Sequence, residues 1–131
     1  MTTTDLYFSK KLKGTISEIR PRVEASLMNI GFGLVTEIDM QAKLKEKLNK
    51  HIKPYTILGI CNPKFAAEAI EAEENIGIFL PCKVLLKQTG DNEVEVVVLN
   101  PKGPMQVMQN SKLNALADTV TNMLKKATDE I

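Results

Sequence analysis

Several residue types on which enzymes commonly rely are scarce in this 131-residue sequence, which has one histidine, two cysteines and no tryptophan. The single histidine, His51, stands in a lysine-rich stretch with no acid or nucleophile predicted beside it, so we expect it to be solvated. Glycine-rich phosphate loops, His-Glu metal motifs and nucleophile elbows are also missing. The sequence therefore carries none of the usual signatures of nucleotide-binding proteins, metalloproteases or serine hydrolases.

A large net charge and a long apolar run are missing as well. Lys and Arg number 17 against 16 Asp and Glu, so no overall field favours nucleic acid or an anionic membrane. No apolar run approaches the ~18 to 20 residues of a membrane span, and the first residues lack the basic and apolar regions of a signal peptide. We expect a cytoplasmic protein with reduced cysteines that binds neither nucleic acid nor membrane.

What is present is ordinary globular composition, with 44% hydrophobic and 25% charged residues. A chain of this length buries a substantial core, and we expect one domain over residues 1–131. Residues 6–12 predict a first strand with Leu6 and Phe8 on one face. Thr15 and Glu18 then match a capping box, and apolar residues at spacings of three and four predict a helix to about residue 30, kinked at Pro21.

Residues 32–40 alternate between apolar and polar side chains, which predicts a half-buried strand. The alternation puts Leu34, Thr36 and Ile38 on the core face, with Glu37 and Asp39 on the outer face. Asp39 is placed to cap a short helix that ends at about Pro54, on which Leu44, Leu48 and Ile52 recur every four residues among lysines.

The stretch from 55 to 86 is where we expect the chain to be organised. Residues 57–61 are apolar on both faces and predict a central strand, which ends in Cys61. Asn62 and Pro63 predict a helix start, with Asn62 as the N-cap. The buried stripe of this helix is predicted to be Phe65, Ala66, Ala69 and Ile70. A second strand then begins at Cys82, which shares a face with Val84 and Leu86.

A hairpin and a long helix complete the chain. Thr89-Gly90-Asp91 predicts a tight turn, with Leu86 opposite Val94 on the core face and Lys87 opposite Glu93 on the outer face. Residues 105–109 predict a helical turn. Ser111 is the predicted N-cap of the last helix, whose apolar stripe is Leu113, Leu116, Ala117, Val120, Met123, Leu124 and Ala127.

The predicted fold class is α+β, with two layers: a mostly antiparallel sheet and two long helices on one face. A doubly wound parallel sheet is disfavoured because the strands at 32–40 and 92–99 have polar second faces, whereas parallel strands are normally covered on both sides. The core is strand, helix, four strands, helix, with two short inserted helices.

Four stretches resemble one known family. They are Gly31-Phe-Gly-Leu-Val-Thr-Glu-Ile-Asp39, Leu44-Lys-Glu-Lys-Leu48, Pro54-Tyr-Thr-Ile-Leu-Gly-Ile-Cys-Asn-Pro63 and Ile76-Gly-Ile-Phe-Leu-Pro-Cys82. Together they resemble the family of the domain of unknown function 302, over nearly the whole chain. The resemblance implies a compact α+β domain with the strand-helix-four-strand-helix core, and it implies no activity that can be assigned to particular residues.

The candidate ligand-binding residues are Cys61, Asn62, Lys64 and Cys82. Cys61 is predicted at the end of one strand and Cys82 at the start of another, where both side chains could face a cleft, and Asn62 with Lys64 at a helix start would suit an anion. Against a reactive role, free cysteines are among the most buried residues and behave as small hydrophobic groups. A soft-metal site with Met105 or Met108 is the other possibility for the thiols, but the spacing does not resemble Cys-x-x-Cys, so no metal is expected.

Three classes of function remain open. The first is a binding module for a small molecule or anion in a cleft near Cys61 and Cys82. The second is a thiol enzyme or redox sensor that uses Cys82. The third is an interaction domain without a ligand, which forms a homodimer through the sheet face that the helices leave uncovered, where Val35, Leu85 and Val97 are expected.

Overall fold

The computed structural model describes all residues from Met1 to Ile131 and contains one six-stranded sheet in the order β1-β2-β6-β5-β4-β3, in which every neighbouring pair is antiparallel. The strands are β1 (Thr2–Thr3), β2 (Tyr7–Lys13), β3 (Gly33–Asp39), β4 (Tyr55–Cys61), β5 (Cys82–Gly90) and β6 (Glu93–Leu99). The helices are α1 (Ile16–Met28), α2 (Met40–Leu48), α3 (Pro63–Ala72), the 3-10 helix η1 (Glu74–Phe79), α4 (Lys102–Met108) and α5 (Ser111–Asp129). None of them is long and apolar enough to cross a membrane.

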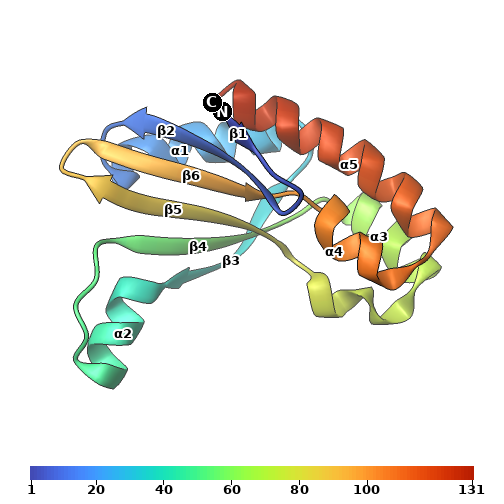
Figure 1. The fold of residues 1–131 in the computed structure, drawn as a ribbon, viewed down its shortest axis with the longest axis horizontal. Coiled ribbons are helices and arrows are strands. Elements are labelled where there is room, and N and C mark those ends of the chain that lie inside the picture. Colours follow the sequence, from blue (N-terminus) through green and yellow to red (C-terminus); the bar gives the residue numbers. More distant parts are fainter.

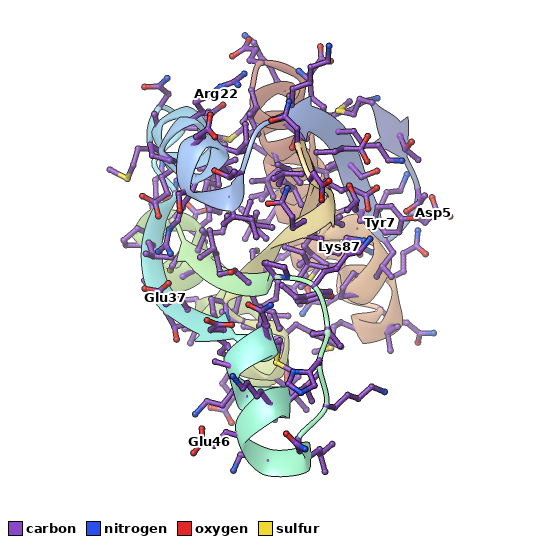
Figure 2. The ribbon with its side chains drawn as sticks, turned by 90° about the vertical axis from the view of Figure 1, so that its left-hand side faces the viewer. Asp5, Tyr7, Arg22, Glu37, Glu46 and Lys87 are labelled. Atoms are coloured by element: carbon purple, nitrogen blue, oxygen red, sulfur yellow. The ribbon has the colours of Figure 1, made fainter.

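Helices α1 and α5 cover one face of the sheet. The main core joins buried residues of α1 and α5 to strand residues that all lie on this face: Phe8, Leu58, Ile60, Val84, Leu86, Val94, Val96 and Val98. Figure 2 shows the two sides, with Arg22 of α1 and Glu37 on the helix side and Tyr7 and Lys87 on the opposite side. The predicted two-layer α+β class, with a mostly antiparallel sheet and two long helices on one face, is therefore confirmed.

The first helix begins where the capping box predicts. The backbone N–H of Glu18 donates to Thr15 Oγ1 at 3.3 Å, and the helix then runs without interruption through Pro21. The first strand, in contrast, begins one residue later than predicted. Leu6 is 57% exposed and does not share the buried face of Phe8, which is fully buried. The core face of β2 is therefore provided mainly by Phe8.

The strand predicted at residues 32–40 is confirmed as β3, but the prediction that it is half-buried with a regular alternation is wrong. The pairing shifts between Leu34, which faces Ile60, and Thr36, which faces Gly59, so a bulge at Val35 reverses the alternation. Glu37 consequently lies on the helix side, where its Oε2 pairs with Arg20 Nη1 at 2.7 Å, while Ile38 lies on the uncovered face. No residue of β3 is buried, because β3 is the edge strand of the sheet and pairs with β4 alone.

Asp39 caps the inserted helix as predicted, with its Oδ1 accepting from the N–H of Ala42 at 3.0 Å. The helix ends at Leu48, earlier than the predicted Pro54, because Asn49 adopts a left-handed conformation with φ of 50°. Ile52 therefore lies outside it.

The predicted hairpin register is also wrong, by two residues. Leu86 lies opposite Val96, and Lys87 lies opposite Glu95, with their charged atoms 2.7 Å apart. The strand continues to Gly90 with an irregularity after Gln88, so the loop contains only Asp91 and Asn92. A shift of two residues leaves every side chain on the same face, and Glu93 and Glu95 are both acidic, so neither burial nor charge could distinguish the two registers.

The N-cap of α5 is Asn110 and not Ser111. Asn110 Oδ1 accepts from the N–H groups of Lys112 and Leu113, at 3.0 and 3.2 Å. Its Nδ2 donates to the carbonyl of Ala72 at 3.0 Å, which ties the start of α5 to the end of α3. Asn is at least as good an N-cap residue as Ser, and the hydrogen bond from Asn110 Nδ2 to the carbonyl of Ala72 favours Asn110 as the cap in this structure.

Candidate functional site

The junction of β4 and α3 is held by Asn62. Its Oδ1 accepts from the N–H groups of Lys64 and Phe65, at 3.1 and 3.4 Å, which makes it the predicted N-cap of α3. Its Nδ2 donates to the carbonyl of Ile30 at 3.2 Å, so it also joins α3 to the segment after α1. Pro63 occupies the first turn, where a missing N–H costs nothing. The end of β4 is therefore rigidly connected to the helix that follows.

A cavity of about 60 Å³ lies beside this junction, between α3, α4, α5 and the adjoining ends of β4 and β5. Of its 17 lining residues 14 are hydrophobic and none is charged. Its inner side belongs to a second small core made of Ala69, Ile76, Met105, Leu113 and Ala117. Figure 1 shows these helices gathered at the right-hand end of the sheet. The cavity thus lies between the end of the sheet and the helices around it.

The aromatic and small residues of the cavity explain why space remains there. Phe32 and Phe65 stack with ring centroids 6.3 Å apart and an interplanar angle of 27°. Ala66 and Ala69 of α3, together with Ala117 of α5, line the same cavity with short side chains. Alanines on facing helices bring the backbones close without filling the gap between the larger side chains.

Three of the four candidate residues, Cys61, Asn62 and Cys82, line this cavity. Lys64 is exposed and does not line it. Both cysteines are free thiols and half-buried. The hydrogen bonds of Asn62 to the backbone engage both its amide oxygen and its amide nitrogen. The structure therefore brings the two thiols and the cap to one apolar space, and leaves the lysine outside it.

Cys82 is the first residue of β5 and follows Pro81, which packs closely against Gly59 of β4. A Cβ added to Gly59 on β4 would lie 2.7 Å from Pro81 Cγ, so only glycine allows Pro81 to pack against the strand. The pKa of the Cys82 thiol is raised to about 11, mainly by burial and to a smaller extent by Cys61, while Lys83 acts in the opposite direction. The thiol is therefore protonated at neutral pH, whereas a nucleophilic cysteine needs a lowered pKa.

The predicted buried stripe of α3 is partly wrong. Ala69 is buried and Phe65 and Ala66 are half-buried, but Ile70 is 48% exposed. The buried side of α3 faces α5 and η1. Ile70 follows the buried Ala69 by one residue, which turns its side chain away from this side of the helix. The sequence did not predict that α5 supplies Leu113, Leu116 and Val120 to the cavity, whereas Met105 of α4, considered there as a partner of the thiols, does line it. The apolar stripe of α5 was visible, but nothing in the sequence showed that this part of it faces α3.

The fold and the site together define a small α+β domain with an uncharged apolar cavity at one end of its sheet. The chain belongs to the family described as Domain of unknown function DUF302, whose model matches residues 8–131. A crystal structure of an uncharacterized conserved DUF302 protein from Bacillus stearothermophilus is similar, with a TM-score of 0.86 and 27% identity over 94% of this chain and 95% of the other. No curated protein matches the sequence.

Proposed function

We propose that the domain binds a small molecule through an uncharged, apolar group that enters the cavity beside Cys61 and Cys82. The observation that supports this most directly is the lining, which has 14 hydrophobic residues of 17 and no charge. Ligand sites in proteins are typically concave and mostly apolar, with a few polar groups. The side-chain heteroatoms on this lining are those of Asn62, the two thiols and Met105.

The volume limits the size of the group that fits. At about 60 Å³ the cavity is smaller than the engineered apolar cavities of about 150 Å³ that bind benzene. Several of its lining residues, including Phe65, Ala66 and Leu116, are half-buried, so the space opens toward solvent. A short alkyl chain or the edge of one ring is the group expected inside, with the rest of the molecule outside. An anion is less well matched, since Lys64 lies outside the lining.

A pair of probes of similar size but different charge tests the proposal. Toluene and benzoate are titrated separately into ¹⁵N-labelled protein, and backbone amide shifts are followed by NMR. We expect toluene to shift the amides of α3, α5 and the start of β5, and benzoate to shift them less. Shifts from benzoate alone, centred on residues 62–64, would support the anion alternative instead.

Two neighbouring alanines on α3 provide a matched pair of variants. Ala66→Leu adds a side chain to the lining, whereas Ala67→Leu adds the same side chain at an exposed position that does not line the cavity. We expect Ala66→Leu to weaken toluene binding strongly and Ala67→Leu to leave it unchanged. Equal binding by the two variants would place the ligand elsewhere and contradict the proposal.

A second candidate function, an interaction domain that forms a homodimer, is favoured by a different observation. The sheet face opposite α1 and α5 carries a row of apolar side chains that nothing in the chain covers, and such a row is commonly an interface. Both functions are compatible with a cytoplasmic protein, in which the two half-buried thiols stay reduced. The thiol enzyme is the least supported alternative, because the pKa of Cys82 is raised to about 11.

A further inference from the structure

The uncovered face of the sheet has an apolar row that crosses four strands. The register places Ile38 beside Ile57, Ile57 beside Leu85, and Leu85 beside Val97. Charged side chains border the row on the same face, with Lys87 paired to Glu95 on one side. Ile38 is 40% exposed and the other three are half-buried. The row is therefore continuous across the four strands and partly exposed to solvent.

Helix α2 is a second feature that the rest of the chain covers only sparsely. It has nine residues, none of them buried, and the element it contacts most is β4. Isolated helices shorter than about 12 to 15 residues are marginal in water, so a helix of this length normally depends on packing. Leu48 is 69% exposed, and Lys43, Lys45 and Lys47 give the helix a basic surface. The helix thus presents both apolar and basic groups to solvent.

The opposite end of the molecule has the complementary charge. The end of α3 and the start of η1 contain Glu68, Glu71, Glu73 and Glu74, and apolar Ile78 of η1 is 82% exposed. None of these glutamates and none of the α2 lysines forms an ion pair within the chain. Figure 1 shows α2 at the lower left and η1 at the lower right, beyond opposite ends of the horizontal strands. Helix α2 is therefore locally basic, and the α3–η1 segment is locally acidic, with Lys112 beside Glu68 and Glu71.

We propose that a second copy of this chain covers the open sheet face, and that α2 of each protomer packs against the α3–η1 segment of the other. This inference rests on the homodimer proposed above and specifies its arrangement. A two-fold axis in the plane of the sheet, running across the strands, exchanges the two ends and places each basic α2 against an acidic segment. An axis running along the strands would leave the two ends unexchanged, so the basic α2 helices would lie at one end of the dimer, the acidic segments at the other, and these charge pairs would not form.

The arrangement gives each exposed apolar feature a partner in one closed, symmetric interface. The two apolar rows face each other across the axis, and Leu48 of α2 approaches the surface around Ile78 of the other protomer. Such an interface is isologous, with every contact made twice, so it forms a dimer and not an open filament. The charge pairs at the two ends determine which way round the protomers bind.

Charge reversal on the full-length protein tests the arrangement. Lys45→Glu and Glu74→Lys are made singly and together, and the dimer dissociation constant is measured by analytical ultracentrifugation. Because each contact occurs twice, we expect either single reversal to raise this constant about 10-fold or more, and the double reversal to restore it within about 3-fold. Lys125→Glu, at an exposed position on α5, is the matched control and should change nothing.

Zero-length carbodiimide cross-linking gives an independent readout, because it joins lysines to glutamates that touch. In the covalent dimer we expect links between α2 lysines and glutamates 68–74. A wild-type protein that stays monomeric at micromolar concentration would overturn both the dimer and its arrangement. A dimer that ignores the reversals and lacks these links would overturn the arrangement alone, leaving the homodimer proposal in place.

Discussion

The rate at which Cys82 is alkylated tests whether burial beside the cavity raises the pKa of its thiol. Burial raises the pKa of this thiol from 9.0 to about 11. A shift of two units means about 100-fold less thiolate at any pH well below 9, and the thiolate is the form that reacts with alkylating agents. Restricted access in the half-buried site slows the reaction further. We therefore expect native Cys82 to alkylate at least about 100-fold more slowly than the same residue in the unfolded chain.

The assay is a pH series of iodoacetamide labelling, quenched at intervals, with the two cysteines resolved by peptide mapping. The same protein in urea supplies the rate of the unfolded thiol. Cys61→Ser is a useful companion variant, since it removes the smaller contribution of Cys61 to the raised pKa but keeps the larger one from burial. Labelling of Cys82 should stay slow in that variant.

The expected result is a native rate that rises with pH toward 11 without reaching a plateau near neutrality. Rapid labelling of Cys82 at pH 6 would refute the reasoning, because it requires a thiolate that an apolar site disfavours. It would also move the thiol enzyme ahead of the binding module.

Three further predictions concern stability, each measured as the free energy of unfolding in urea. Asn110→Ala should cost about 1 kcal/mol or more, because it removes the α5 cap and the bond to Ala72, whereas Ser111→Ala should be nearly neutral; the reverse order would show that the cap is misassigned. Leu58→Ala should cost about 2 to 5 kcal/mol because Leu58 is fully buried, while Val35→Ala, at an exposed bulge, should change little, and similar values for the two would contradict the bulge. Arg20 holds the pKa of Glu37 below its ordinary value through a hydrogen bond, so this carboxylate stabilises the fold above its unfolded pKa, and the contribution is lost as pH falls through the folded pKa. Glu37→Gln should therefore weaken the pH dependence of the free energy of unfolding in that acidic range. An unchanged pH profile would show that the Arg20–Glu37 pair contributes nothing.

The fold was predictable because local signals and burial agreed for most elements. The capping box at Thr15 and the Asn62-Pro63 helix start predicted where two helices begin, and the apolar stripe of the last helix predicted its buried side. The predictions that failed relied on the two-residue alternation of side chains along a strand. A one-residue bulge or a two-residue change of register cannot be detected from that alternation. The extra residue Val35 forms a bulge that exchanges the faces of the side chains after it in β3. The two-residue shift in the hairpin leaves each side chain on its predicted face, so burial could not reveal it.

The candidate site was predictable only in part, for a related reason. Cys61, Asn62 and Cys82 come together because β4 ends, and its antiparallel neighbour β5 begins, at the same edge of the sheet, which the sequence order indicated. The opposite side of the cavity comes from α4 and α5, which are distant in sequence and carry no motif that points to α3. Asn110 links these parts, yet a capping rule alone could not choose between it and Ser111.

The central claim is that the cavity beside Cys61 and Cys82 takes an uncharged apolar group, and the most direct measurement is toluene binding followed by amide shifts in the wild type and the two alanine variants. The account predicts saturable shifts around α3, α5 and the start of β5 in the wild type and in Ala67→Leu, and their loss in Ala66→Leu. No saturable shift in the wild type, or shifts that survive in Ala66→Leu, would contradict it.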